Sequence, residues 1–304
     1  AVEKIGRITH NCVGIHDDKC IVSLKKNLQL AKSVAPNTSC FGIQLAHAGR
    51  KASTQRPWEG RSALTKEEKP WKTICPSPIP FQETWHVPEE MKLSDIERVK
   101  KKFISASLKA VEIGFDLIEI HGTHGYLLHQ FLSPISNKRK DKYGGSLENR
   151  MRFPLEVFSS VKKTLPKDFP LGMRITGTDW EINGINEDEA SIFAKELEKI
   201  GCHYVCVSSG GNTPNPKIPL RPHYQVHLAK RIKKDTEMVV RTVGMIKDPF
   251  EANNIVINQD ADMVAMARAF LSNPRWVWDA AKILNYDIEA VSYTHLTLPT
   301  NGTV

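Results

Sequence analysis

The sequence predicts an α/β fold, specifically a (β/α)8 barrel of which about six of the eight strands are present. Three observations support this prediction. Short strands rich in β-branched residues alternate with amphipathic helices, a pattern that implies parallel strands joined by right-handed crossovers. Polar residues gather directly after the carboxyl ends of these strands, where barrels carry their active sites. No GxGxxG motif follows any strand, which leaves little support for a Rossmann nucleotide-binding domain.

Runs of β-branched and other apolar residues define six predicted strands, at residues 41–45, 115–120, 171–175, 203–208, 238–243 and 261–265. The clearest helix precedes the second strand. Ser94 and Glu97 form a capping box at its start, apolar residues follow at helical spacing, and Gly114 permits a left-handed turn at its end. This helix is therefore expected to begin at Ser94.

The same helix–glycine–strand pattern returns further along the chain. Asn186 caps a second helix, and Gly201 follows that helix before the fourth strand. Residues 143–146 form a turn that leads into a helix at 147–165. Residues 51–90 are rich in proline and tryptophan and too long for a plain connection. Loops of this length commonly act as lids or covers over a functional site.

The composition is that of a soluble globular enzyme. The 304 residues are 40% hydrophobic and 25% charged, which excludes collagen, coiled-coil and disordered chains. No apolar run approaches the ~20 residues of a membrane span. The net charge of +8, from 42 basic against 34 acidic residues, is spread along the chain rather than clustered with aromatic residues. It indicates solvated faces and attraction for anionic small molecules, and predicts no nucleic-acid or membrane partner.

The cysteines are scattered and none forms a CxxC motif, the six being Cys12, Cys20, Cys40, Cys75, Cys202 and Cys206. Isolated cysteines in a chain of this length favour a reducing cytoplasm and predict no zinc or iron–sulfur cluster.

The densest group of chemically active side chains is His121, His124 and Tyr126, directly after the second strand. A zinc site is one interpretation, but it needs a third ligand such as His129 or His47. A histidine pair satisfied within the core is another. The favoured interpretation is a pair of hydrogen-bond donors at the barrel mouth that stabilise negative charge on a substrate oxygen. The neighbouring phenol, with an ordinary pKa near 10, suits proton delivery to a strongly basic carbon.

Longer motifs around this cluster resemble the old yellow enzyme family of FMN-dependent ene-reductases. HGTHGYLLHQFLSP at residues 121–134 runs on into NKRKDKYGGSLENRMRF at 137–153, and GIQLAHAGRK stands at 42–51. RPWEG at 56–60 is similar to the bacterial xenobiotic-reductase branch. The similarity covers roughly residues 5–290. Because these motifs are long and discontinuous, chance agreement is very improbable.

The resemblance implies a non-covalently bound FMN that NADPH or NADH reduces. Gln44 resembles the glutamine that hydrogen-bonds the pyrimidine edge of the flavin, and Arg174 resembles the arginine beside its N1 and O2 atoms. Barrel loops after the last strands commonly bind phosphate through backbone amides, and the matching residues here are Gly244, Ala267 and Arg268. Ser209 and Gly210 stand in a further loop that is similar to one approaching the cofactor.

The resemblance also implies the chemistry. His121 and His124 would bind the carbonyl oxygen of an α,β-unsaturated carbonyl compound, flavin N5 would deliver hydride to the β-carbon, and Tyr126 would protonate the α-carbon. Three other interpretations stay open: the barrel of a 2,4-dienoyl-CoA reductase-like flavoenzyme, an inactive FMN-binding protein or fragment, and a metal-dependent lyase.

Both ends depart from the family pattern. Relatives begin with about two more strand–helix units, so we expect this chain to lack two strands and to be a poor enzyme by itself. Residues 291–304 match no family tail and are expected to be non-native. Residues 1–290 are then one FMN-binding barrel domain. The family tail often contributes a dimer contact, so a homo-oligomer stays open.

Overall fold

The computed structural model describes residues 1–287, so the predicted non-native tail at 291–304 lies outside the described residues. Its centre is a parallel six-stranded sheet in the order β1-β4-β5-β6-β7-β8. These strands are β1 (Gly42–Leu45), β4 (Leu117–Gly122), β5 (Leu171–Thr176), β6 (Tyr204–Ser208), β7 (Val239–Thr242) and β8 (Met263–Val264). All six predicted strands are confirmed, and sequential strands pair side by side.

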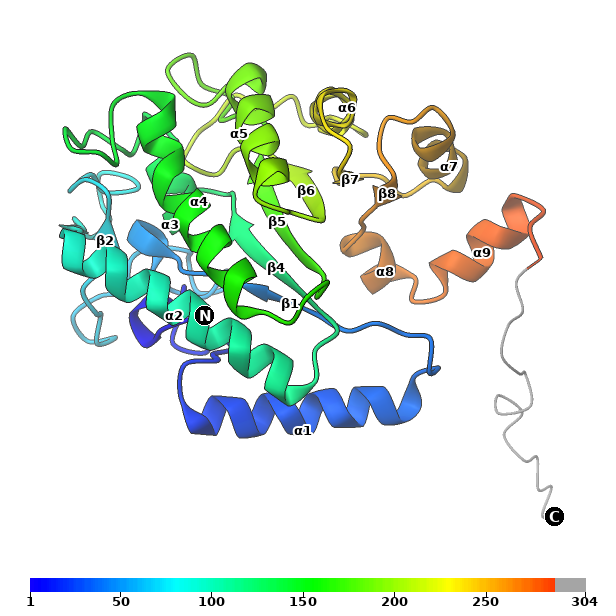
Figure 1. Ribbon diagram of the computed structural model, residues 1–304, viewed down its shortest axis with the longest axis horizontal. Helices are drawn as coiled ribbons and strands as arrows, with labels where there is room; N and C mark the ends of the chain where they lie inside the picture. Colours follow the sequence, from blue (N-terminus) through cyan, green and yellow to red (C-terminus); the bar gives the residue numbers. More distant parts are fainter. Residues whose placement is uncertain (288–304) are drawn as a thin grey trace.

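Helices follow most of the strands and cover one face of the sheet. Figure 1 shows α2, α4 and α5 side by side along that face, and neighbouring helices in this series are in contact. The main helices are α1 (Asp18–Val34), α2 (Leu93–Ile113), α4 (Leu147–Thr164), α5 (Glu187–Lys199), α6 (Val226–Asp235) and α7 (Pro249–Ile257). Shorter ones are η1 (Lys4–Gly6), η2 (Gly49–Lys51), α3 (Leu127–Leu132), α8 (Arg268–Ser272) and α9 (Trp276–Ile283). None of the helices in residues 1–287 is long and apolar enough to cross a membrane.

The sheet stays open at both ends, as expected for part of a barrel. Within the described residues β1 pairs only with β4, and β8 pairs only with β7. The central strands are almost wholly buried, whereas Val239 on β7 and Met263 on β8 are each 41% exposed. The hydrophobic core therefore lies between the central strands and helices α2 to α6.

Local signals in the sequence correctly predict several helix ends. Asn186 and Ser146 cap α5 and α4 through their side chains, and Gly114 ends α2 with a φ of 99°. The predicted capping box of Ser94 and Glu97 is wrong. Helix α2 begins at Leu93, because the carboxylate of Asp95 accepts the backbone N–H of the N-cap residue Lys92 at 3.0 Å. Glu97 instead pairs with Lys100 on the surface.

Two segments have structure that local patterns did not indicate. Helix α1 was not predicted; it packs against α2 and presents mostly exposed side chains. The 51–90 segment contains a small parallel pair, β2 (Ile74–Cys75) with β3 (Glu89–Glu90). Its strands are too short for a periodic signal.

A buried charged group ties the N-terminal segment to the rest of the fold. Glu3 is 6% exposed as a residue, and its carboxylate lies 2.9 Å from Nε2 of His47 and also pairs with Arg98. Burial by itself raises the pKa of Glu3, but the hydrogen bonds and charges of His47 and Arg98 outweigh it and lower the pKa to about 2.

We expect Glu3→Gln to reduce the free energy of unfolding by about 2 kcal/mol at pH 7. Because the folded pKa is depressed, this stabilisation is present above the ordinary pKa of 4.5 and is lost as the pH falls towards about 2. Urea unfolding at pH 7 and pH 3 measures it. The difference between wild type and variant should shrink at pH 3, and an equal difference at both pH values would contradict the assignment.

Candidate active site

Parallel pairing brings four polar side chains into one row across the sheet. His121 on β4 is the register partner of Arg174 on β5, Arg174 of Cys206 on β6, and Cys206 of Arg241 on β7. Register partners on adjacent strands point to the same face of a sheet. The row therefore lies together on one face of the sheet, although its members span about 120 residues of sequence.

The predicted cluster of His121, His124 and Tyr126 is a compact group in space. The ring centre of His121 lies 5.2 Å from that of His124 and 5.0 Å from that of Tyr126. His124 Nε2 lies 2.8 Å from the Ser208 hydroxyl. Both ring nitrogens of His121 are buried and lack a hydrogen-bond partner among the described residues. A histidine pair satisfied within the core would not leave these nitrogens free, so the geometry favours a site that receives a ligand.

The environment keeps both imidazoles neutral and the phenol protonated. Burial, followed by the charge of Arg174, lowers the pKa of His121 to about 3. Burial also lowers the pKa of His124 well below its usual range, with further contributions from His121 and Arg174. Burial raises the pKa of Tyr126 to about 12. At neutral pH each imidazole carries one N–H, and the phenol keeps its proton.

Lys51, which follows the GIQLAHAGR run, braces the turn that carries the cluster. Its Nζ donates to the backbone carbonyls of His124 at 3.0 Å and Gly211 at 2.8 Å, and it lies over the Tyr126 ring. Burial, with a smaller effect from the charge of Arg50, lowers the pKa of Lys51 to about 8. This lysine was not singled out as functional, because its partners lie more than 70 residues away.

Gly125 is required in this turn. Its φ is 69°, and a Cβ there would lie 2.2 Å from the carbonyl oxygen of Gly211. We expect Gly125→Ala to lower the free energy of unfolding by at least about 2 kcal/mol, from left-handed strain plus this backbone clash. The control is Gly145→Ala, since Gly145 has a φ of 84° with nothing within 4 Å and so carries the strain alone. Urea unfolding compares them, and equal losses would show that the close approach to Gly211 is unimportant.

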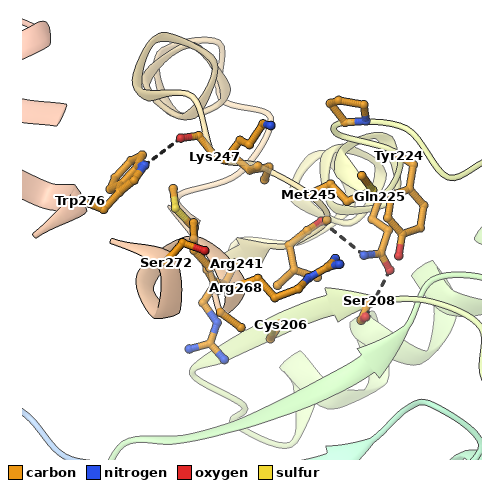
Figure 2. A pocket seen from close by; sticks show the side chains of 18 of the residues that line it. Cys206, Ser208, Tyr224, Gln225, Arg241, Met245, Lys247, Arg268, Ser272 and Trp276 are labelled. Atoms are coloured by element: carbon orange, nitrogen blue, oxygen red, sulfur yellow. Dashed lines mark hydrogen bonds between the residues drawn. The ribbon is translucent and has the colours of Figure 1, made fainter. Parts of the chain in front are cut away.

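A cavity of about 780 Å³ opens beside the row, a size typical of small-molecule sites. Figure 2 shows Arg241, Arg268 and Lys247 around it, with Trp276 at the far side donating to the Lys247 carbonyl. Its lining contains four cationic side chains and no carboxylate, the cations being Arg174, Arg241, Lys247 and Arg268. Such a cavity favours an anionic ligand.

The floor of this cavity holds an unsatisfied cation. Nε of Arg174 is buried without a hydrogen-bond partner among residues 1–287. In the lining Gly244 has a φ of 127°, a conformation that residues with a side chain rarely adopt. The site can therefore donate hydrogen bonds to an electron-rich ring edge at its floor and hold an anion beside its other cations.

The comparison with known families decides what this ligand is. The model of the NADH:flavin oxidoreductase / NADH oxidase family matches residues 1–287. The chain belongs to this family. Its cofactor is FMN, with NADPH or NADH as the reductant, and the orphaned Arg174 nitrogen and cation-rich cavity fit that group. The resemblance to the old yellow enzyme family is thereby confirmed.

Two curated relatives illustrate the similarity. The chain is 39% identical over 290 residues to an NADPH dehydrogenase of Geobacillus sp. (strain WCH70), covering 95% of this chain and 79% of that protein. It is also 39% identical over 307 residues to an NADH:flavin oxidoreductase of Gibberella zeae, covering 95% of this chain and 73% of that protein.

Solved structures agree on the fold. One is a 2-naphthoyl-CoA reductase in complex with 2-naphthoyl-CoA, with a TM-score of 0.80 and 24% identity, covering 93% of this chain and 43% of that one. Another is histamine dehydrogenase from Rhizobium sp. 4-9, with a TM-score of 0.73 and 24% identity, covering 88% of this chain and 38% of that one. The barrel-type α/β fold predicted from the sequence is therefore confirmed.

The residues predicted to hold FMN separate into two groups. One group lines the large cavity, namely Arg174, Gly244, Ala267 and Arg268. The other group does not. Gln44 donates to the Glu119 carboxylate at 2.6 Å, Ser209 donates to Gln225 at 2.6 Å, and Gly210 packs near Trp180 and Ile218. Ser209 thus supports the wall of the cavity through the lining residue Gln225, whereas Trp180 and Ile218, the neighbours of Gly210, do not line it.

Several lining residues were missed at the sequence level. They include Tyr224, Gln225, Arg241, Lys247 and Trp276. Arg241 could have been predicted as a site residue, because a cation inside a predicted strand needs a polar partner. In the structure it pairs with Glu119 across the sheet. Tyr224 and Trp276 gave no signal, because their approach to the cavity depends on how α6 and α9 pack.

Proposed function

We propose that this protein uses NADPH or NADH to reduce the activated C=C bond of an α,β-unsaturated carbonyl compound. The observation that carries the proposal is the pairing of neutral imidazoles with a protonated phenol beside a cation-lined cavity. When bound, FMN supplies the hydride chemistry in both half-reactions. Arg174 would lie at its electron-rich edge, and Gly244, Ala267 and Arg268 at its phosphate.

The side chains of this protein would orient the substrate and handle its charge. His121, whose ring nitrogens have no partner among the described residues, would donate to the carbonyl oxygen together with the neighbouring imidazole of His124. The β-carbon then becomes electrophilic, and the developing negative charge is stabilised. Neutral imidazoles suit this role because each donates a hydrogen bond through its N–H and keeps that proton throughout the reaction. The phenol of Tyr126 holds its proton at neutral pH and releases it only to a strongly basic centre, such as the substrate α-carbon.

A two-step flavin experiment tests the proposal. FMN-loaded protein is mixed anaerobically with NADPH, and flavin absorbance should bleach; addition of 2-cyclohexenone should then restore it. Protein that fails to bind FMN, or that bleaches with neither NADPH nor NADH, would refute the cofactor assignments. Bleached protein that no enone reoxidises would refute the substrate class. A rate unchanged by EDTA argues against metal-dependent chemistry.

We also propose that residues 1–290 act as one FMN-binding domain and that the protein works in a reducing compartment, the cytoplasm. The continuous sheet over the described residues supports the first proposal. The second is supported by the six cysteines, all of which lie in the described residues and are free.

A further inference from the structure

The turn that carries His124 and Tyr126 has a backbone that requires external support. His124 has a φ of 57° and Gly125 a φ of 69°. Left-handed backbone is unfavourable for a residue with a side chain. The turn is held at Gly125, whose amide donates to Nδ1 of His129 at 2.8 Å and whose carbonyl accepts from Nε2 of Gln130 at 2.6 Å.

The bond from Gly125 determines the protonation of His129. Nδ1 accepts the Gly125 N–H, so it carries no proton, and the ring is the neutral tautomer protonated at Nε2. Nε2 lies 2.9 Å from Oδ1 of Asp179, and both side chains are fully buried. The Thr176 hydroxyl lies 3.5 Å from the same Nδ1, a longer contact. If His129 were an imidazolium, its Nδ1–H would point at the N–H of Gly125, and the two donors would repel each other.

Asp179 is in turn anchored by donors from elsewhere. Its Oδ2 accepts from the Ser133 hydroxyl at 2.6 Å and from the Ile185 amide at 2.9 Å. Burial by itself would raise the pKa of Asp179, but His129 and these hydrogen bonds lower it. The lowered pKa keeps the carboxylate ionised, with Oδ2 accepting two hydrogen bonds and Oδ1 in close contact with Nε2 of His129.

We infer that His129 and Asp179 are a positioning pair that holds the turn between His124 and Tyr126 in the geometry needed for catalysis. The inference deepens the proposed function and rests on it. Both side chains are fully buried against protein groups, so they act through the turn and are not catalytic residues. Asp179 selects the tautomer, His129 holds the Gly125 amide, and that amide sets the placement of the imidazole and the phenol on either side of it.

Asp179→Asn tests the pair, because an amide offers only one acceptor oxygen. If its NH₂ group faces His129, the imidazole must move its proton to Nδ1 and lose the bond from Gly125. If its NH₂ group faces Ser133 and Ile185, the anchoring bonds are lost. We expect enone reoxidation of the flavin and affinity for a para-substituted phenol to fall about 10- to 100-fold. FMN affinity and flavin reduction by NADPH should stay within about threefold.

A second pair of variants keeps the test decisive if Asp179→Asn does not fold. His129→Gln can accept from Gly125 and donate to Asp179, so it should retain most phenol affinity, whereas His129→Leu should lose it. Asp262→Asn is the control, since this carboxylate also binds a backbone amide, that of Val240 at 2.8 Å, away from the site. ¹⁵N NMR of the histidines reports the tautomer directly.

The expected NMR result is a neutral His129 protonated at Nε2 in the wild type. A proton on Nδ1 would overturn the inference. So would variants whose phenol affinity equals that of the wild type, or whose FMN affinity falls by the same factor as their phenol affinity. If the wild type is reduced by NADPH but reduces no enone, the proposed function fails, while phenol affinity and the NMR tautomer still decide the positioning role.

Discussion

Replacement of Tyr126 by phenylalanine is expected to slow reoxidation of the flavin by an enone about 10²- to 10⁴-fold, the range for loss of a general acid. Flavin reduction by NADPH should stay within about twofold, because that half-reaction needs no proton from the phenol. Stopped-flow absorbance measures the two half-reactions separately. The expectation follows from the position of the phenol, 5.0 Å from the His121 ring centre, and from burial that raises its pKa to about 12.

The matched control is Tyr143→Phe. Tyr143 is also a buried phenol whose pKa burial raises to about 12, but its hydroxyl donates to Glu156, far from the cavity lining. Both half-reactions of this variant should match the wild type. A Tyr126→Phe protein in which the two half-reactions slow by the same factor would show that the phenol supports the cofactor site rather than donating a proton.

Replacement of His121 by alanine is expected to lower the rate of enone reduction about 10²- to 10³-fold and to weaken phenol binding in parallel. The ring makes no hydrogen bond within the described residues, so its removal breaks none there. Steady-state kinetics with an enone and phenol titration monitored by flavin absorbance measure the effect. His227→Ala, at an exposed histidine, serves as the control.

The low pKa of His121 adds a pH test to the same variant. Because burial and Arg174 lower that pKa from 6.5 to about 3, the unfolded chain binds more protons than the folded protein between these values. This group therefore makes the folded protein more stable as the pH rises from 3 to 6.5. The contribution should vanish in His121→Ala, and the enone rate of the wild type should show no imidazole titration between about pH 5 and 8. A titration in that range would mean that an imidazolium is the active form.

The sequence by itself determined the six strands of the sheet and the helices α2, α4 and α5. Runs of β-branched residues marked all six strands, because a central parallel strand must be apolar on both faces. Asn186 and Gly114 marked helix ends, since capping depends on one side chain or one backbone angle. The cluster of His121, His124 and Tyr126 could be predicted because its members lie within six positions of one another in the chain.

Only the tertiary structure decided which polar groups meet. Gln44 reaches Glu119 rather than the cavity lining, and Lys51 bridges two carbonyls, at His124 and Gly211. The contact of His129 with Asp179 joins residues 50 positions apart in sequence, and no local pattern links them. Strand register and helix packing set these pairings, and both depend on the burial of apolar surface over the whole sheet. The sequence therefore determined which residue types stand at the strand ends, whereas packing decided which of them share a hydrogen bond.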